Sequence, residues 1–402
     1  MGSTESDRRG LRNSVSARLL TVICAVVLCS ILVAGLWPFR APQNEVSWLT
    51  NGNGLLFGDY GSLLSAGAFK SSNSTDGACL EIWVEPSAIE GSGTILSFYP
   101  SEHQSTLIEL RRWLDGIGLQ RRILGQKRSA KTAKIYANHV FRAGKPVFFT
   151  ISSGERGTSI YVDGALAKVS RDFRFSREDW AGQLIIGNSS VTVDTWSGQL
   201  KGLAIYNREL PASQVMQHYQ SWLGSGRPDT SSPDGAVALY LFNEVRGNTV
   251  HNLADSATDL VIPERFFVLH KRFLKRPWNE YHPGWHYWSD VGINIAGFIP
   301  LGFFFCAYFS LVRRIEHPAA VTLGLGFAVS LSIEVLQGFL PTRVSGMTDV
   351  ITNTLGTAIG VIAFSHKALH FVPSKSVSAP STMEANVHVP SRQSADENAK
   401  ES

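Results

Sequence analysis

Residues 19–39 read LLTVICAVVLCSILVAGLWPF and contain no charged side chain. At 1.5 Å per residue, roughly 20 helical residues cross the ~30 Å hydrocarbon core of a bilayer, so this run predicts a transmembrane helix. A cleaved signal peptide is the alternative, but the run is long for one and no clear small-residue cleavage site follows it. We therefore expect an uncleaved helix, with Trp37 anchoring it at the membrane interface.

Three further apolar runs, at 291–312, 319–340 and 347–364, predict three more spans with short connecting loops. If the spans alternate in direction, the basic residues beside them all fall on one side: Arg8, Arg9, Arg12, Arg18, Arg313, Arg314 and Lys367. Basic flanks mark the cytoplasmic side. The segment 1–18 and the Ser- and Pro-rich tail 373–402, which we expect to be disordered, are thus predicted to be cytoplasmic, and residues 45–261 extracytoplasmic.

The long segment 45–261 alternates short β-rich runs with Gly, Asn, Asp and Ser turns. Tyr161–Ala165 reads as a strand, an Asp-Gly turn and a second strand, which is a strong hairpin signal. Cys79 is the one cysteine in the segment, so no internal disulfide supports it. Regular short strands of this kind predict a sandwich or barrel, and five runs carry the pattern: 80–84, 147–151, 159–162, 183–186 and 199–206.

Four motifs in this segment resemble the laminin-G-like, concanavalin-A-like jelly roll: residues 159–164 (SIYVDG), 184–188 (LIIGN), 196–200 (WSGQL) and 204–210 (AIYNREL). Together with the four apolar spans, the resemblance implies a fold of mixed class, a four-helix transmembrane bundle with an all-β jelly-roll sandwich inserted after the first helix. It also implies that Trp196 packs in the structure. A glycan or a protein is the expected partner, although a fold alone does not fix a function.

Acidic residues of the sandwich are weak candidates for chemistry. Glu81 and Glu85 lie about 13 Å apart along one strand, whereas paired glycosidase carboxylates lie ~5–9.5 Å apart, so we expect two solvated outer-face glutamates. Asp163 and Asp194 are candidate calcium ligands, and Asp163 is explained more simply as a turn residue. No residue is predicted as catalytic, no other metal is expected, and the net charge of +4 gives no reason to expect nucleic acid.

Residues 262–289 are rich in aromatic and basic side chains, which favour the membrane interface and anionic lipid. The helical spacing of Phe266, Leu269 and Phe273 predicts a short interfacial helix. The alternative is an ordinary linker packed on the sandwich.

The late spans, within 290–366, share an unusual polar pattern. Asp-Val-x-x-Asn-x-x-Gly opens the second span at Asp290 and the fourth at Asp349, and its Asp, Asn and Gly share one helical face. Glu334 and Gln337 share a face near the outer end of the third span, and Arg343 follows as the expected counter-charge. We predict a polar outer-leaflet face formed by Asp290, Asn294, Glu334, Gln337, Arg343, Asp349 and Asn353, with close helix packing at Gly297, Gly356 and Gly360.

Residues 294–303, 332–343 and 349–360 are together similar to the VanZ-like family, with Gly346 where we expect that family often to carry Asp. The resemblance implies a bacterial cytoplasmic-membrane protein, and the family takes its name from low-level teicoplanin resistance. The polar face would then bind a lipid headgroup or a lipid-linked envelope precursor, or else lock the bundle together. A non-enzymatic envelope protein is the favoured reading, and the alternatives are an intramembrane enzyme acting on lipid-linked sugar and a plain adhesion module on an anchor.

Overall fold

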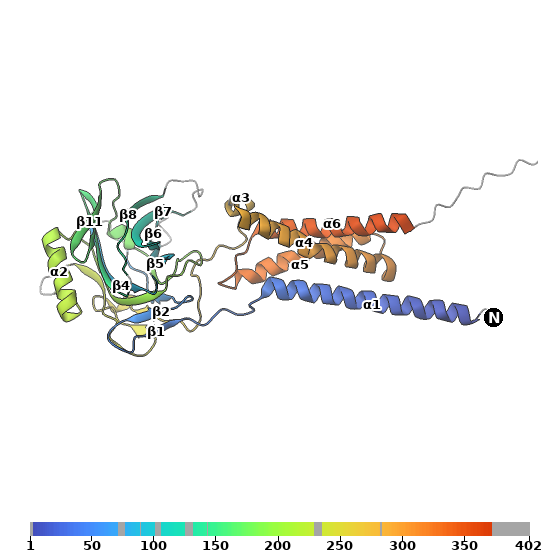
Figure 1. The fold of residues 1–402 in the computed structure, drawn as a ribbon, viewed down its shortest axis with the longest axis horizontal. Helices are drawn as coiled ribbons and strands as arrows, with labels where there is room; N and C mark the ends of the chain where they lie inside the picture. Colours follow the sequence, from blue (N-terminus) through green and yellow to red (C-terminus); the bar gives the residue numbers. More distant parts are fainter. Residues whose placement is uncertain are drawn as a thin grey trace, which may run out of the picture.

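A computed structural model describes residues 3–70, 77–88, 90–100, 106–124, 132–142, 144–228, 235–281 and 284–371 of the chain. The predicted disordered tail at 373–402 lies outside these residues. The described chain has two parts, a β-sandwich at one end and a bundle of long helices at the other (Figure 1). The N-terminus and the end of the last helix lie at the end of the bundle away from the sandwich (Figure 1).

The sandwich consists of two antiparallel sheets. The first has the order β1 (Val46–Trp48), β2 (Leu55–Phe57), β13 (Gly198–Tyr206), β4 (Ala78–Pro86), β9 (Val147–Gly154), β10 (Gly157–Val162), β11 (Ala165–Ser170), with β14 (Ala236–Tyr240) also paired to β13. The second has the order β15 (Thr249–Val250), β16 (Leu260–Val261), β3 (Leu63–Ser65), β12 (Gln183–Ile186), β5 (Ser92–Tyr99), β6 (Thr106–Trp113), β7 (Gly116–Ile123), β8 (Ala133–Ala137). The predicted sandwich, inserted after the first helix, is confirmed.

The inward-facing residues of both sheets form one apolar core, in which Trp180 and Trp196 are fully buried. Trp196 packs on Phe57 with ring centroids 5.7 Å apart, as predicted for a structural tryptophan. Asp163 and Gly164 both have positive φ, 50° and 79°, which is the backbone of the predicted Asp-Gly hairpin turn. The Asp163 carboxylate also accepts a hydrogen bond from the Phe148 amide at 3.0 Å, so its turn role is confirmed.

Helix α2 (Ala212–Ser225) covers the outer face of the first sheet and corrects one prediction. Glu81 is fully buried beneath it rather than solvated. Its carboxylate accepts hydrogen bonds from the Tyr206 hydroxyl at 2.8 Å and the Trp222 indole at 3.1 Å, and pairs with His218 at 2.9 Å. A buried carboxylate needs such partners, and the network fixes α2 to strands β4 and β13. Glu85, by contrast, remains partly exposed beside Lys201.

Four helices are long and apolar enough to cross a membrane, over Ser16–Leu36, Trp285–Val312, Pro318–Gly338 and Met347–His366. They belong to α1 (Ser3–Leu36), α4 (Trp285–Ala307) with the π-helical turn that follows it (Tyr308–Val312), α5 (Pro318–Gly338) and α6 (Met347–Phe371). The described chain also contains α3 (Pro277–Glu280) and two 3₁₀ turns, Arg177–Trp180 and Ser256–Thr258.

Glycines allow α4 and α6 to touch backbone to backbone. A Cβ atom at Gly356 would collide with the carbonyl oxygen of Ile295, and one at Gly360 with that of Ile299. Gly297 was predicted to share this contact, and this is wrong, because a Cβ atom there would meet no described atom within 4 Å. Gly302 makes the contact from α4 instead, against the backbone of Thr357.

The segment between the sandwich and the bundle is mostly extended, so the predicted helix through Phe266 and Phe273 is wrong. The amide of Phe266 donates to the carbonyl of Pro42 at 3.1 Å, which pairs the outgoing chain with the incoming one and leaves no helical bond for it. The ring of Phe266 is buried in the sandwich beside Tyr60. The alternative of a linker packed on the sandwich holds for this first part, and the short helix α3 follows it.

The α4–α6 contact gives a matched pair of substitutions. Gly356→Val places two methyl groups against the α4 backbone and should lower the free energy of unfolding by about 3 kcal/mol through overpacking. Gly297→Val makes the same chemical change on an open helix face and should leave stability nearly unchanged. Thermal unfolding of the full chain in detergent, followed by helical circular dichroism, measures both, and equal loss in the two variants would contradict the contact.

Candidate functional site

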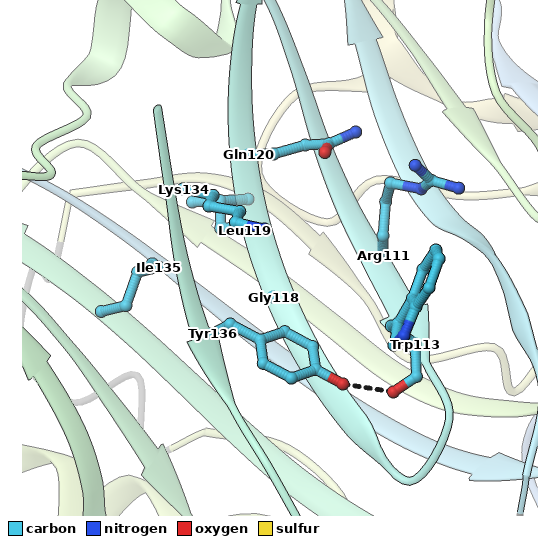
Figure 2. A pocket seen from close by; sticks show the side chains of 8 residues that line it. All are labelled: Arg111, Trp113, Gly118, Leu119, Gln120, Lys134, Ile135 and Tyr136. Atoms are coloured by element: carbon cyan, nitrogen blue, oxygen red, sulfur yellow. Dashed lines mark hydrogen bonds between the residues drawn. The ribbon is translucent and has the colours of Figure 1, made fainter. Parts of the chain in front are cut away.

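A pocket lies on the outer face of the second sheet, across β6, β7 and β8 (Figure 2). Its volume is about 290 Å³, and it is open to solvent. The pocket is lined by Arg111, Trp113, Gly118, Leu119, Gln120, Lys134, Ile135 and Tyr136. Strand alternation explains the outward side chains, because Arg111, Trp113, Gly118, Gln120, Lys134 and Tyr136 occupy alternate positions on their strands.

Two glycines shape the floor of the pocket. Gly118 stands opposite both Arg111 and Tyr136 in the strand register. A Cβ atom at Gly118 would lie 2.6 Å from the Tyr136 ring, and one at Gly116 would strike the same side chain. The missing side chains therefore let the Tyr136 ring lie against the sheet. Its hydroxyl donates to the carbonyl of Trp113 (Figure 2), which fixes the ring, and the Trp113 side chain is 58% exposed beside it.

The loop 187–197, between β12 and β13, binds to the same outer face and supports one wall of the pocket. Asp194 in this loop forms an ion pair with Arg111 at 2.8 Å and accepts a hydrogen bond from Thr94. Ser189 donates to the buried carboxylate of Glu109 at 2.7 Å, and Gln120 donates to the other oxygen of that carboxylate at 2.7 Å. The acidic groups next to the pocket are thus already bonded within the protein.

Asp194, predicted as a candidate calcium ligand, has these protein partners instead, and the described residues contain no group of three His, Cys, Asp or Glu side chains placed to hold a metal. Calcium binding by the sandwich stays a prediction. The pocket residues themselves were not predicted from the sequence. A weak signal was present, since glycine inside a strand often marks the close approach of another group, and Gly116 and Gly118 stand between the aromatic residues Trp113 and Tyr136 in the sequence.

In the membrane part, the structure brings Asn294, Asp349 and Glu334 together near the sandwich-facing ends of α4, α5 and α6. The Asn294 amide donates to Asp349 at 2.8 Å, and Glu334 lies close enough to interact electrostatically with Asp349. Glu334 is 1% exposed, and its carboxylate accepts a hydrogen bond from the backbone amide of Gly346 at 2.6 Å. The exposed Asp290 lies close enough to act electrostatically on Asp349.

Other members of the predicted polar face hold helices together. Asn353 donates to the Ser330 hydroxyl at 2.9 Å, which joins α6 to α5. Gln337 donates to the carbonyl of Gly35 at 2.7 Å, which joins α5 to α1. Arg343 was expected to be the counter-charge of Glu334, but its guanidinium donates to the carbonyl of Trp37 just beyond α1, where the last turn of a helix leaves carbonyls without partners.

Lys271 is the cation that acts on Glu334. Its ammonium group donates to the carbonyls of Gln337, at 2.6 Å, and Leu340 at the end of α5. A cation at a helix C-terminus is stabilising there. Burial, with a smaller contribution from Lys275, lowers the pKa of Lys271 to about 8, and the charge of Glu334 opposes this shift. The sequence placed Lys271 in an interfacial segment and gave no sign of this contact.

Glu280, in α3, supplies a carboxylate to the α5–α6 loop. It accepts hydrogen bonds from the Thr348 amide at 3.0 Å and from the Thr348 hydroxyl, at the first turn of α6. A Cβ atom at Gly346 would collide with this carboxylate. The absence of a side chain at Gly346 therefore leaves space for the carboxylate of Glu280. The acidic group at this loop thus comes from α3 and not from the loop itself.

Lys271 yields a prediction with a neighbouring control. Lys271→Gln should weaken the attachment of residues 341–346 and raise the exchange rate of their amides about tenfold, because a charged hydrogen bond at a half-buried site contributes about 1.5 kcal/mol. The exposed Arg272, changed to Gln, should leave that exchange unaltered. Hydrogen–deuterium exchange of the full chain in detergent measures both, and no change in the Lys271 variant would exclude this role.

Comparisons with known proteins agree with the two parts of the chain. Residues 233–370 match the VanZ/LLP1 family model, and residues 58–216 match that of the concanavalin A-like lectin/glucanases superfamily. A comparison with curated protein sequences finds no match.

Among solved structures, the chain is similar to a putative carbohydrate-binding protein of Bacteroides ovatus, at 11% identity over 55% of this chain and 58% of that one, with a TM-score of 0.36. It is similar to the SAP-like pentraxin of Limulus polyphemus, at 13% identity over 56% and 97%, with a TM-score of 0.34. It is also similar to the binding domain of botulinum neurotoxin serotype D, at 14% identity over 47% and 49%, with a TM-score of 0.33. The two family models thus match separate regions of the chain, the concanavalin A-like lectin/glucanases superfamily at residues 58–216, after the first apolar helix, and VanZ/LLP1 at residues 233–370.

Proposed function

We propose that this chain is a non-enzymatic protein of the bacterial cytoplasmic membrane that holds a saccharide-binding sandwich on the outer surface. The observation that carries the proposal is the pocket on β6–β8, with Tyr136 lying against the sheet and Trp113 exposed beside it. Sugar rings present apolar C–H faces and hydroxyl edges. An aromatic floor with convergent polar groups, here Arg111, Gln120 and Lys134, complements both.

The proposed orientation rests on charge and on the arrangement of the helices. Basic residues flank the spans at the N-terminus, after the second span and after the fourth. In Figure 1 the start of α1 and the end of α6 both lie at the end of the bundle away from the sandwich. Placing the basic side in the cytoplasm puts the sandwich outside, where cell-wall glycans are its proposed partners.

The pocket predicts a loss of binding on removal of its aromatic rings. Trp113→Ala should weaken binding of the full chain to peptidoglycan-derived or other cell-wall oligosaccharides severalfold, up to about tenfold, because a stacking ring contributes about 0.5–1.5 kcal/mol. Trp48→Ala removes a half-buried tryptophan of strand β1, in the other sheet, and serves as the control.

Retention of the oligosaccharides by the full chain in detergent, on a glycan array, measures this effect. Binding unaffected by Trp113→Ala would refute this site. The bound saccharide should be recovered unchanged by mass spectrometry, whereas a shortened or transferred product would favour the alternative of an enzyme acting on lipid-linked sugar.

For the membrane part, we propose that the group at Asn294, Asp349 and Glu334 binds the polar part of a membrane-bound envelope component. Asn294 and Asp349 are half-exposed at the helix ends, whereas Glu334 is buried behind them. Polar and ionisable groups at membrane depth are costly to place, which favours a function for those that are not fully enclosed.

The teicoplanin resistance implied by the family resemblance gives this proposal a cellular test. Expression of the full chain should reduce binding of a labelled teicoplanin-type lipoglycopeptide to cells, and Asp349→Asn, which keeps the size of the side chain, should restore binding at matched protein abundance. Flow cytometry of labelled cells reports the difference. Equal binding with and without the protein would remove the resistance role and leave the sandwich proposal unaffected.

A further inference from the structure

The charges around the sandwich pocket are unbalanced in favour of cations. Its lining residues include Arg111 and Lys134 and no acidic side chain. Two carboxylates beside the pocket are already engaged, Asp194 by Arg111 and Thr94, and Glu109 by Ser189, Gln120 and Arg122. Because Asp194 offsets the charge of Arg111, the positive charge that remains for an incoming ligand is that of Lys134.

Lys134 is the cation that is available. It lies exposed on β8, directly opposite Gln120 in the register, and forms no ion pair or hydrogen bond with any described residue. Tyr136 follows it two positions along the same strand and on the same face, about 7 Å away. That spacing is about the width of one sugar ring, so a ring stacked on Tyr136 would carry its substituents to the ammonium group.

Arg111 contributes in a different way. Its ion pair with Asp194, at 2.8 Å, fixes the guanidinium at the wall of the pocket, while its Nε–H is buried and makes no hydrogen bond to the described chain. The site thus offers one unpaired cation, Lys134, beside an arginine that Asp194 holds in place at the wall of the aromatic floor.

We infer that the ligand of the pocket is an acidic saccharide, a sugar chain bearing carboxylate or phosphate groups, with a ring on Tyr136 and Trp113 and an acidic group at Lys134. This inference rests on the proposed saccharide-binding function and specifies its ligand class. A partly desolvated charge pair of this kind distinguishes an acid from its neutral ester by about tenfold in affinity.

Paired probes test the charge separately from the sugar. The probes are several oligouronates that differ in their sugar backbone, including tetragalacturonate, and the methyl ester of each. Microscale thermophoresis measures the binding of every probe to the full chain in detergent. At least one acid should bind about tenfold more tightly than its ester, and the difference should shrink as salt is raised. Lys134→Gln should abolish the difference, whereas Lys201→Gln, on strand β13 of the other sheet, should preserve it.

The possible failures are distinguishable. If neutral forms bind as well as acids, or a neutral glycan binds best, and Trp113→Ala abolishes that binding, the charge inference is overturned while saccharide binding stands. If acids are preferred but Lys134→Gln retains the whole difference, the placement of the acidic group is overturned. If no saccharide of the panel or of the cell-wall array binds in a Trp113-dependent way, both the inference and the proposed function of the pocket fall.

Discussion

The architecture depends on a short stretch where the two ends of the sandwich pair with each other. The Asn44 amide donates to the carbonyl of Glu264, and the Phe266 amide to that of Pro42, each at 3.1 Å. The Asn44 side chain adds bonds to the carbonyls of Ser62 and Pro263. Because α1 packs on α5 through Gly35, where a Cβ atom would meet Ile333 at 2.9 Å, the chain must return to the bundle close to where it left. An inserted domain with paired ends satisfies this requirement, and a domain with distant ends would separate the first span from the others.

The same constraint explains why the segment after the sandwich touches both parts of the molecule. His270 donates its amide to the carbonyl of Ser190, and its ring stacks on Tyr99 at 3.5 Å between centroids. A few residues later, Lys275 pairs through its backbone with Ser345 and Met347, beside the loop between α5 and α6. The loop that contains Ser190 also contains Asp194, which holds Arg111 at the pocket. The segment that leaves the sandwich is therefore hydrogen-bonded to the sandwich at its start and to the α5–α6 loop at its end.

The local sequence pattern predicted most of the fold, and the predictions that were wrong share one cause. The spans and the strands follow from apolar length and from alternation, which are properties of one segment at a time. Strand alternation places Glu81 on the outer face of its sheet and so predicts that it is solvated. The sequence of its own strand does not indicate that α2 covers that face. Gly297 repeats the motif of Gly356, but α4 is rotated so that Gly302 meets α6 instead. The predicted helix through Phe266 failed because long-range pairing with Pro42 replaced the local hydrogen bonds. Each error required knowledge of a partner distant in sequence.

The two candidate sites differ in how clearly a sequence can reveal them. A carboxylate within an apolar span is conspicuous because its placement in hydrocarbon costs at least about 2.5 kcal/mol, so the grouping of Asn294, Glu334 and Asp349 could be anticipated from helical spacing. Its charge balance could not, because Lys271 and Glu280 come from outside the spans. The sandwich pocket has no such signal. Arg111, Trp113 and Lys134 are ordinary surface residues of a strand, and they form a site because the register sets them beside two glycines and the ring of Tyr136. The register between strands depends on the pairing of the whole sheet. A site that is formed by this register can therefore be identified only after the sheet structure is known.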